Sequence, residues 1–301
     1  MKKIFIYVQE YVSELDKRVL CISIALISIL IFLNYQFAIS PYLSKQSFTY
    51  CFLGWYFIFL LTLSFPYFLH NLFSHNSYRV DKTFLLLLLI APSVFAWKMA
   101  SNLDFPISSN KSINAYWNYI LYWPAKLTAM VMCLFILWRL FNKEQPFYGT
   151  SLTGFQAKPY LQMLLMMLPL IAAASTQPDF LTMYPKLKSI ATLVQDNEWW
   201  KPLLYELSYG SDFVGIELYF RGFLILAFAK WVGKDAILPM ALFYCTIHFG
   251  KPLGECISSF FGGLILGVVT YHTRTIWGGL IVHLGIAWLM ELGGYIGNHF
   301  F

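Results

Sequence analysis

Five ionisable side chains lie within apolar stretches near the end of this 301-residue chain: Glu217, Arg221, His248, Glu255 and His283. A charged side chain at membrane depth costs roughly 2.5–3.5 kcal/mol on insertion scales, so several of them together need partners and usually serve a function. A carboxylate and a histidine can hold and deprotonate a water molecule, and a second histidine can stabilise an oxyanion. The set therefore indicates peptide-bond hydrolysis.

Other interpretations of the same side chains stay open. Glu217 and Arg221 stand four residues apart, so on a helix they share one face and can form a structural ion pair. Some of the set would also suit zinc with an open position: His248, His283 and Glu217 or Glu255. Their spacing is not that of an H-E-x-x-H metalloprotease, so nothing in the sequence requires a metal or another cofactor. Glu291, on the helical face of His283, is interpreted as a solvated residue at the membrane surface.

His248 closes a short apolar run, and the residues that follow it mark a break. Gly250, Lys251 and Pro252 cannot continue a regular helix, which places His248 at a helix end beside a chain reversal. Non-helical backbone at membrane depth is tolerated only against protein or water. We therefore expect a wetted cavity at His248.

The composition defines the class of protein: 58% of the residues are apolar, 12% are charged and the mean hydropathy is +0.60. These values predict an integral membrane protein, because runs of about 20 apolar residues match a hydrocarbon layer of roughly 30 Å. Candidate spans lie near 19–40, 49–69, 83–100, 118–141, 160–176, 203–229, 235–249, 255–272 and 276–296. The expected fold is an all-α, multi-pass transmembrane bundle of eight to nine helices with a polar intramembrane cavity. Residues 235–249 are short for a span and suggest a tilted or re-entrant helix.

The chain divides into a cytoplasmic segment (1–18), scaffold membrane helices (19–202) and helices that carry the chemistry (203–301). Basic residues gather in alternate loops, which places the N-terminus in the cytoplasm by the positive-inside rule: Arg79, Lys82, Arg139, Lys143, Lys158, Lys230, Lys234 and Arg274. The net charge of +6 is thus mostly in loops and indicates no affinity for nucleic acid, so membrane lipids are the expected surroundings.

Three short runs resemble the motifs of a known family. Glu217-Leu-Tyr-Phe-Arg221, Tyr244-Cys-Thr-Ile-His248 and His283-Leu-Gly-Ile-Ala287 follow the order and approximate distances of E-E-x-x-x-R, F-x-x-x-H and H-x-x-x-N. These are the motifs of the CAAX prenyl protease type II family, also called CPBP or the Abi group. The resemblance covers roughly residues 203–296.

The resemblance implies a helical membrane core around a polar cavity and an endopeptidase activity. Its substrate would be a peptide or lipopeptide, with prenylation left open. In the family's scheme, the first glutamate and the histidine of motif two activate water, and motif three forms an oxyanion hole. By position, His248 would activate water, His283 would donate to the oxyanion and Arg221 would be the structural partner of motif one.

Three positions depart from the family's pattern. Ile216 replaces the first glutamate, Tyr244 conservatively replaces the phenylalanine of motif two, and Ala287 replaces the asparagine of motif three. Loss of one oxyanion donor lowers rates by roughly 10²–10³ in measured cases. Glu255, seven residues after His248, could supply the missing carboxylate, so either Glu217 or Glu255 can be the base.

The sequence therefore supports an intramembrane endopeptidase as the first hypothesis. The second is a non-catalytic membrane protein on the same fold, acting in partner binding, bacteriocin immunity or scaffolding. A transporter that relays protons through its buried ionisable groups is the third.

Overall fold

The computed structural model describes residues 2–73, 78, 81–194 and 197–300, which leaves Arg79 of the basic loops outside the described residues. The described residues form helices and connecting segments without a strand. Six of these helices are long and apolar enough to cross a membrane, or seven if one bent pair counts as a span. An all-α, multi-pass helical bundle is thereby confirmed, with fewer candidate spans than the eight to nine expected.

The spans share long apolar windows: α2 (Lys17–Phe37), α4 (Phe48–Phe73), α5 (Lys82–Ala100), α6 (Lys111–Phe141), α12 (Leu253–Thr273) and α13 (Trp277–Phe300). The bent pair joins α7 (Lys158–Ala174) to residues 178–193 at 99°. Two expected spans do not meet these criteria. Residues 235–249 hold only the ten-residue α11 (Ile237–Thr246), which rises roughly 15 Å and is too short to cross. Residues 203–229 fail because α9 (Trp200–Glu217) contains more charged residues than the apolar window of a span allows. Three of them are acidic: Glu206, Asp212 and Glu217.

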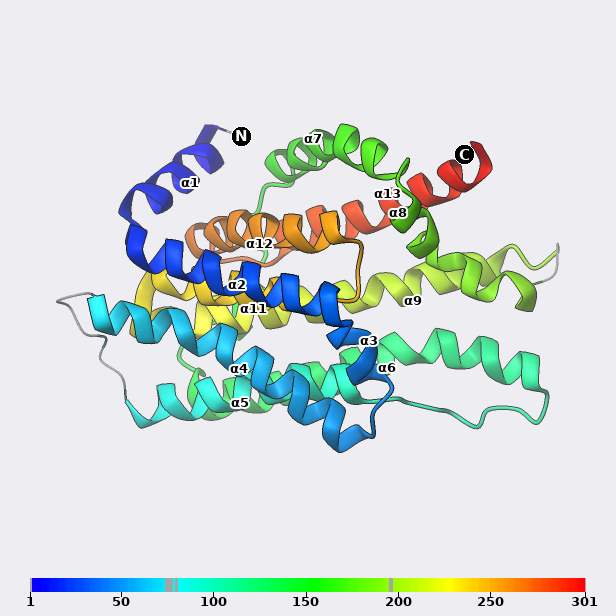
Figure 1. Ribbon diagram of the computed structural model, residues 1–301, viewed down its shortest axis with the longest axis horizontal. Helices are drawn as coiled ribbons and strands as arrows, with labels where there is room; N and C mark the ends of the chain where they lie inside the picture. The colour runs from blue at the N-terminus through cyan, green and yellow to red at the C-terminus, as the bar shows by residue number, and fades with distance from the viewer. Residues whose placement is uncertain (1, 74–77, 79–80, 195–196, 301) are drawn as a thin grey trace. The chain divides into compact units, whose positions relative to one another are not determined.

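The chain forms two compact units, each built from three segments. The first comprises Met1–Ser101, Phe135–Phe155 and Leu218–Ile276, and the second comprises Asn102–Leu134, Gln156–Glu217 and Trp277–Phe301. In the first unit, α4 packs along α5, and α11 packs against both α4 and α12 (Figure 1). The short helix α1 (Lys2–Glu14) lies against α12, and α3 (Ile39–Ser44) lies against α4.

Aromatic rings and a π-helix form the centre of the first unit. The ring of Phe243 on α11 lies 4.4 Å from that of Phe59 and 5.2 Å from that of Phe220. Phe220 belongs to η3 (Leu218–Ala227), a π-helix whose residues are all buried. At Gly222 in this helix, a Cβ would lie 2.5 Å from the carbonyl oxygen of Tyr148, so only glycine allows the backbones to approach this closely. Four short elements complete the unit's description: η1 (Phe147–Gly149), α10 (Ala229–Val232), η4 (Gly233–Ala236) and the turn at 247–252.

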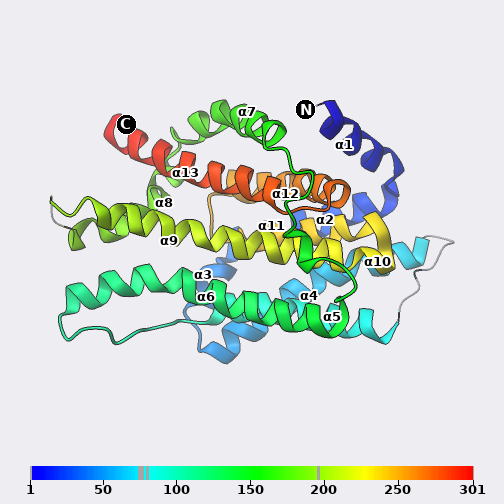
Figure 2. The same cartoon turned by 180° about the vertical axis from the view of Figure 1, so that it is seen from behind.

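In the second unit, α13 packs along α7 and α9, which run beside it in the view from behind (Figure 2). Glycines on α13 make this possible, because a Cβ at Gly285 would lie 2.5 Å from the side chain of Leu164 on α7. The segment between α7 and α9 folds as α8 (Pro178–Met183) and η2 (Lys186–Leu193), which contact α13 and α9 respectively. Glu217 at the end of α9 is thereby placed beside the first two turns of α13, at Gly279 and His283.

Candidate active site

Glu217 and His283 are in direct contact within the second unit. Glu217 ends α9 and its side chain is 0% exposed, while His283 projects from α13. The Nδ1 atom of His283 lies 2.9 Å from Oε1 of Glu217. Because a carboxylate oxygen accepts and cannot donate, Nδ1 carries the hydrogen of this bond. The carboxylate therefore fixes the orientation of the imidazole and leaves Nε2 as its second reactive atom.

Close packing leaves this pair little freedom. Gly279 lies one helical turn before His283 on α13, and a Cβ at this glycine would overlap Oε2 of Glu217. On the other side, the ring of Phe213 meets the His283 ring edge-on, with centroids 4.7 Å apart. The sequence of α13 thus provides both the imidazole and the space that the carboxylate occupies.

The other motif residues form a stack in the first unit. Arg221 on η3 is 0% exposed, and its guanidinium carbon lies 4.2 Å from the ring centroid of Tyr244. The Tyr244 ring lies 4.8 Å from the ring of His248, and the Tyr244 carbonyl oxygen lies 2.9 Å from Nδ1 of His248. Because a carbonyl only accepts, Nδ1 of His248 donates this bond and Nε2 of the neutral ring has a lone pair. A base with this tautomer can take a proton from water.

The break after α11 holds His248 in place. His248 lies two residues beyond the end of α11, as Gly250, Lys251 and Pro252 predict. Two residues of α2 bind this turn: Asn34 donates from Nδ2 to the Phe249 carbonyl at 2.8 Å, and the Tyr35 hydroxyl donates to the Lys251 carbonyl at 2.6 Å. Sequence reasoning did not single out Asn34, although a buried amide in an apolar span is itself a signal of a polar partner.

Glu255 lies in the first turn of α12 and pairs with Lys251, with Nζ and Oε1 separated by 3.3 Å. This is the i,i+4 pairing of a helix start. The role of Glu255 as a substitute base therefore stays a prediction. The same holds for the expected ion pair between Glu217 and Arg221.

A metal site would need several His, Cys, Asp or Glu side chains close together. Among the described residues, no group of three or more His, Cys, Asp or Glu side chains could hold a metal ion. The side chains suggested for zinc belong to both units, so zinc ligation by His248, His283 and Glu217 or Glu255 stays a prediction.

The expectation for Glu291 was wrong. Its side chain is 7% exposed, and it accepts hydrogen bonds from the backbone N–H groups of Lys186 at 2.9 Å and Leu187 at 3.2 Å. The physical reason is that η2 covers this part of α13 and needs an acceptor for its first amides. The spacing of eight residues from His283 showed the shared face, but it could not show that a loop covers it.

Residues 199–289 match the family model described as type II CAAX prenyl endopeptidase Rce1-like. This part of the chain is therefore similar to type II CAAX prenyl endopeptidases. Comparisons with curated proteins and with solved structures gave no match. The endopeptidase match includes all three motif runs and thereby confirms the resemblance that the sequence indicated, over nearly the same residues.

Proposed function

We propose that this protein is a membrane-embedded endopeptidase in which His248 activates water and the Glu217–His283 pair stabilises the transition state. The observation that carries the proposal is the 2.9 Å contact between a fully buried carboxylate and an imidazole in the endopeptidase-like region. A carboxylate buried without a partner would be costly in this environment, whereas a carboxylate that orients a catalytic histidine has a use for its charge.

The pair can supply an oxyanion donor. When His283 is doubly protonated, Nδ1 donates to Glu217 and Nε2 can donate to a developing oxyanion. The negative charge of Glu217 stabilises the imidazolium, as the aspartate does in serine-protease triads. A donor already held in position avoids the cost of reorganising during the reaction.

His248 supplies the base. In the proposed reaction, its Nε2 takes a proton from water, and the hydroxide oxygen bonds to the carbonyl carbon of the scissile peptide. The carbonyl becomes an oxyanion that accepts from His283 Nε2. When the C–N bond then breaks, the proton on His248 passes to the leaving amine, which returns the ring to its neutral state. The motif resemblance, rather than a contact, supports assigning His248 to the same reaction as His283.

The departures from the family pattern bear on rate rather than on the reaction itself. Ala287, one turn after His283 on α13, is 4% exposed and offers no side-chain donor. The oxyanion would therefore depend on His283 alone among the motif-three side chains, with a rate lower by roughly 10²–10³ than that of a two-donor site. Ile216 removes one of the two groups that activate water in the family's scheme, and His248 keeps the other.

The test is a cleavage assay on the purified protein in lipid nanodiscs. The probes are an internally quenched peptide with a farnesylated cysteine and the same peptide without the lipid. We expect cleavage by the wild type, no cleavage by His248→Ala, and normal cleavage by His272→Ala, whose ring stacks on Tyr7 in the same unit. Cleavage retained by a folded His248→Ala protein would contradict the mechanism. Absence of cleavage by wild type, with a cellular effect that survives the glutamate and histidine substitutions, would favour the non-catalytic alternative.

A further inference from the structure

A cavity of about 440 Å³ lies within the second unit, at the end of α9 away from Glu217. Its walls come from the segment before α6, from α6 itself, from η2 and from α9: Asn102, Leu103, Ala115, Asn118, Tyr119, Tyr122, Trp123, Lys186, Ser189 and Tyr205. This volume is in the range of cavities that hold small ligands. The family motifs include none of these residues.

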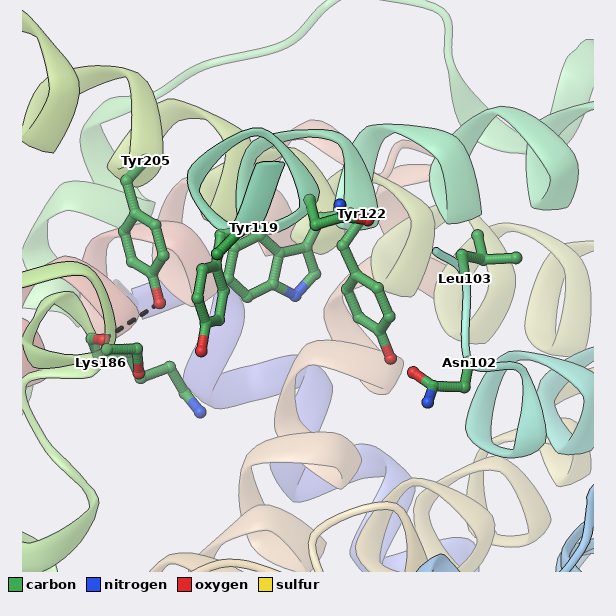
Figure 3. Close-up of a pocket in the computed structure, with 10 residues that line it drawn as sticks. Asn102, Leu103, Tyr119, Tyr122, Lys186 and Tyr205 are labelled. Atoms are coloured by element: carbon green, nitrogen blue, oxygen red, sulfur yellow. Dashed lines mark hydrogen bonds between the residues drawn. The ribbon is translucent and has the colours of Figure 1, made fainter. Parts of the chain in front are cut away.

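Tyrosine and tryptophan rings form much of the cavity wall, and Lys186 contributes an ammonium group from one side. Figure 3 shows the hydroxyl groups of Tyr119, Tyr122 and Tyr205 pointing to the side along which the Lys186 side chain extends. The Trp123 ring meets that of Tyr205 edge-on at 5.3 Å. Tyr205 also belongs to a buried cluster with Tyr116, Ile120 and Ile190, which holds this wall in place.

Lys186 is held at its backbone from two sides. Its N–H donates to Glu291 at 2.9 Å, and its carbonyl accepts from the Tyr205 hydroxyl at 3.1 Å. The backbone of the lysine is therefore fixed on the cavity wall by a residue of α13 and a residue of α9. The buried Glu291, which takes no part in the proposed reaction, thus helps to position Lys186.

The hydrogen bonds at Tyr122 favour an acceptor in the cavity. The Lys126 ammonium donates to the Tyr122 hydroxyl oxygen, which therefore directs its own hydrogen elsewhere. The Tyr122 O–H group and the Lys186 ammonium group, beside aromatic walls, together suit a carboxylate on a flat or large apolar group.

Ring contacts connect the cavity to the candidate active site. Trp123 lies 5.3 Å from Tyr209, Tyr209 lies 5.2 Å from Phe213, and Phe213 lies 4.7 Å from His283, measured between ring centroids. Tyr205 and Glu217 are separated by 217 − 205 = 12 residues of α9, or roughly 18 Å at 1.5 Å per residue. An extended peptide of about five or six residues covers that distance.

We propose that this cavity binds a carboxylate-bearing aromatic or large apolar residue of the substrate peptide, through Lys186 and the Tyr122 hydroxyl. The proposal rests on the proposed function and adds a second substrate-binding site to it. The carboxylate can be the chain terminus of that residue or the side chain of an acidic residue beside it. Continuity with the Glu217–His283 pair favours a peptide over a lipid headgroup as the occupant.

The first experiment measures binding without cleavage. Glu217→Gln protein in nanodiscs of zwitterionic lipid is titrated with an acetylated hexapeptide ending in phenylalanine, as free acid and as amide, and with a third peptide that has an internal glutamate and an amidated end. We expect at least one carboxylate peptide to bind, and about ten-fold weaker binding after Lys186→Gln, which removes a charge-assisted hydrogen bond. Lys188→Gln is the matched control, because its ammonium contacts the carbonyls of Leu181 and Thr182 instead.

The outcomes separate the two proposals. Equal binding of acid and amide forms, or binding that Lys186→Gln does not weaken, would overturn the cavity assignment. Displacement of the peptide by anionic phospholipid, with the same dependence on Lys186, would also overturn it in favour of a lipid site. In active protein, Lys186→Gln should raise KM about ten-fold with little change in kcat, whereas a wild type that binds the peptide but never cleaves any probe would refute only the proposed function.

Discussion

At Glu217 a single carboxylate both orients His283 and supplies negative charge. Glu217→Gln keeps the size of the side chain and an acceptor oxygen, but it removes the charge that stabilises the imidazolium. We expect kcat to fall by about 10²–10³ and the midpoint of thermal unfolding to change little. The assay is cleavage of the quenched peptides, with unfolding followed in detergent.

Glu198→Gln is the matched control for this substitution. Glu198 precedes α9 and pairs with Lys201 at 2.7 Å, at the opposite end of that helix from Glu217. Its replacement should leave kcat unchanged. An equal loss in both variants would mean that the effect at Glu217 is a general effect of removing an acidic charge from this part of the chain.

Among the elements, α13 depends on a glycine opposite the carboxylate. Gly279→Ala would place a methyl group on Oε2 of Glu217, which must then move away from its present position. We expect overpacking to cost about 1–3 kcal/mol of stability and most of the activity. Thermal unfolding and cleavage rate are measured on the same preparation.

Gly262→Ala on α12 separates this effect from the general effect of alanine in a membrane helix. At Gly262 a Cβ would have no atom within 4 Å, so the substitution should be neutral or slightly stabilising. Loss of activity in Gly262→Ala as well would remove the explanation given for Gly279.

The helix α2 stabilises the turn that carries His248. Asn34→Ala would leave the buried Phe249 carbonyl without the Asn34 donor, at a cost of about 1–3 kcal/mol. We expect a lower unfolding midpoint and a lower kcat, measured in detergent and in nanodiscs. Gln36→Ala, at an exposed position on the same helix, should change neither quantity. A stable Asn34→Ala protein with full activity would show that the turn does not need this tether.

Several elements could be predicted from the sequence, because apolar length and helix breakers act locally. The long spans and the position of His248 beyond a helix end followed from apolar runs and from Gly250 and Pro252. The π-helix at 218–227 and the burial of Glu291 could not be predicted in this way, because both depend on residues distant in sequence. For Glu217 and His283, the motif resemblance suggested shared chemistry, but the atoms in contact depend on the space left by Gly279.

At the scale of the whole molecule, the family region is not a separate body. Residues 199–217 and 277–289 belong to the second unit, whereas 218–276 belong to the first. Helices α2, α4 and α5 complete the unit that contains His248, and α7 packs along the helix that contains His283. The N-terminal helices therefore do more than enclose the chemistry, since Asn34 and Tyr35 contact the turn after His248 directly.

The orientation of the chain in the membrane follows from the same helices and from the basic loops. One span, α2, separates the N-terminal segment from Lys45, and three spans (α4, α5 and α6) separate Lys45 from Lys143. The N-terminus and Lys143 should therefore lie on one side of the membrane and Lys45 on the other. By the positive-inside rule, we expect the first side to be the cytoplasm.

Single cysteines introduced at these positions in a cysteine-free background test this assignment. In intact cells, an impermeant maleimide should label Lys45→Cys, whereas Lys143→Cys should be labelled only after the membrane is opened. Labelling of both positions from outside would contradict the number of crossings between them. The reverse pattern would keep the bundle and invert its orientation, which would place the N-terminal segment outside the cell.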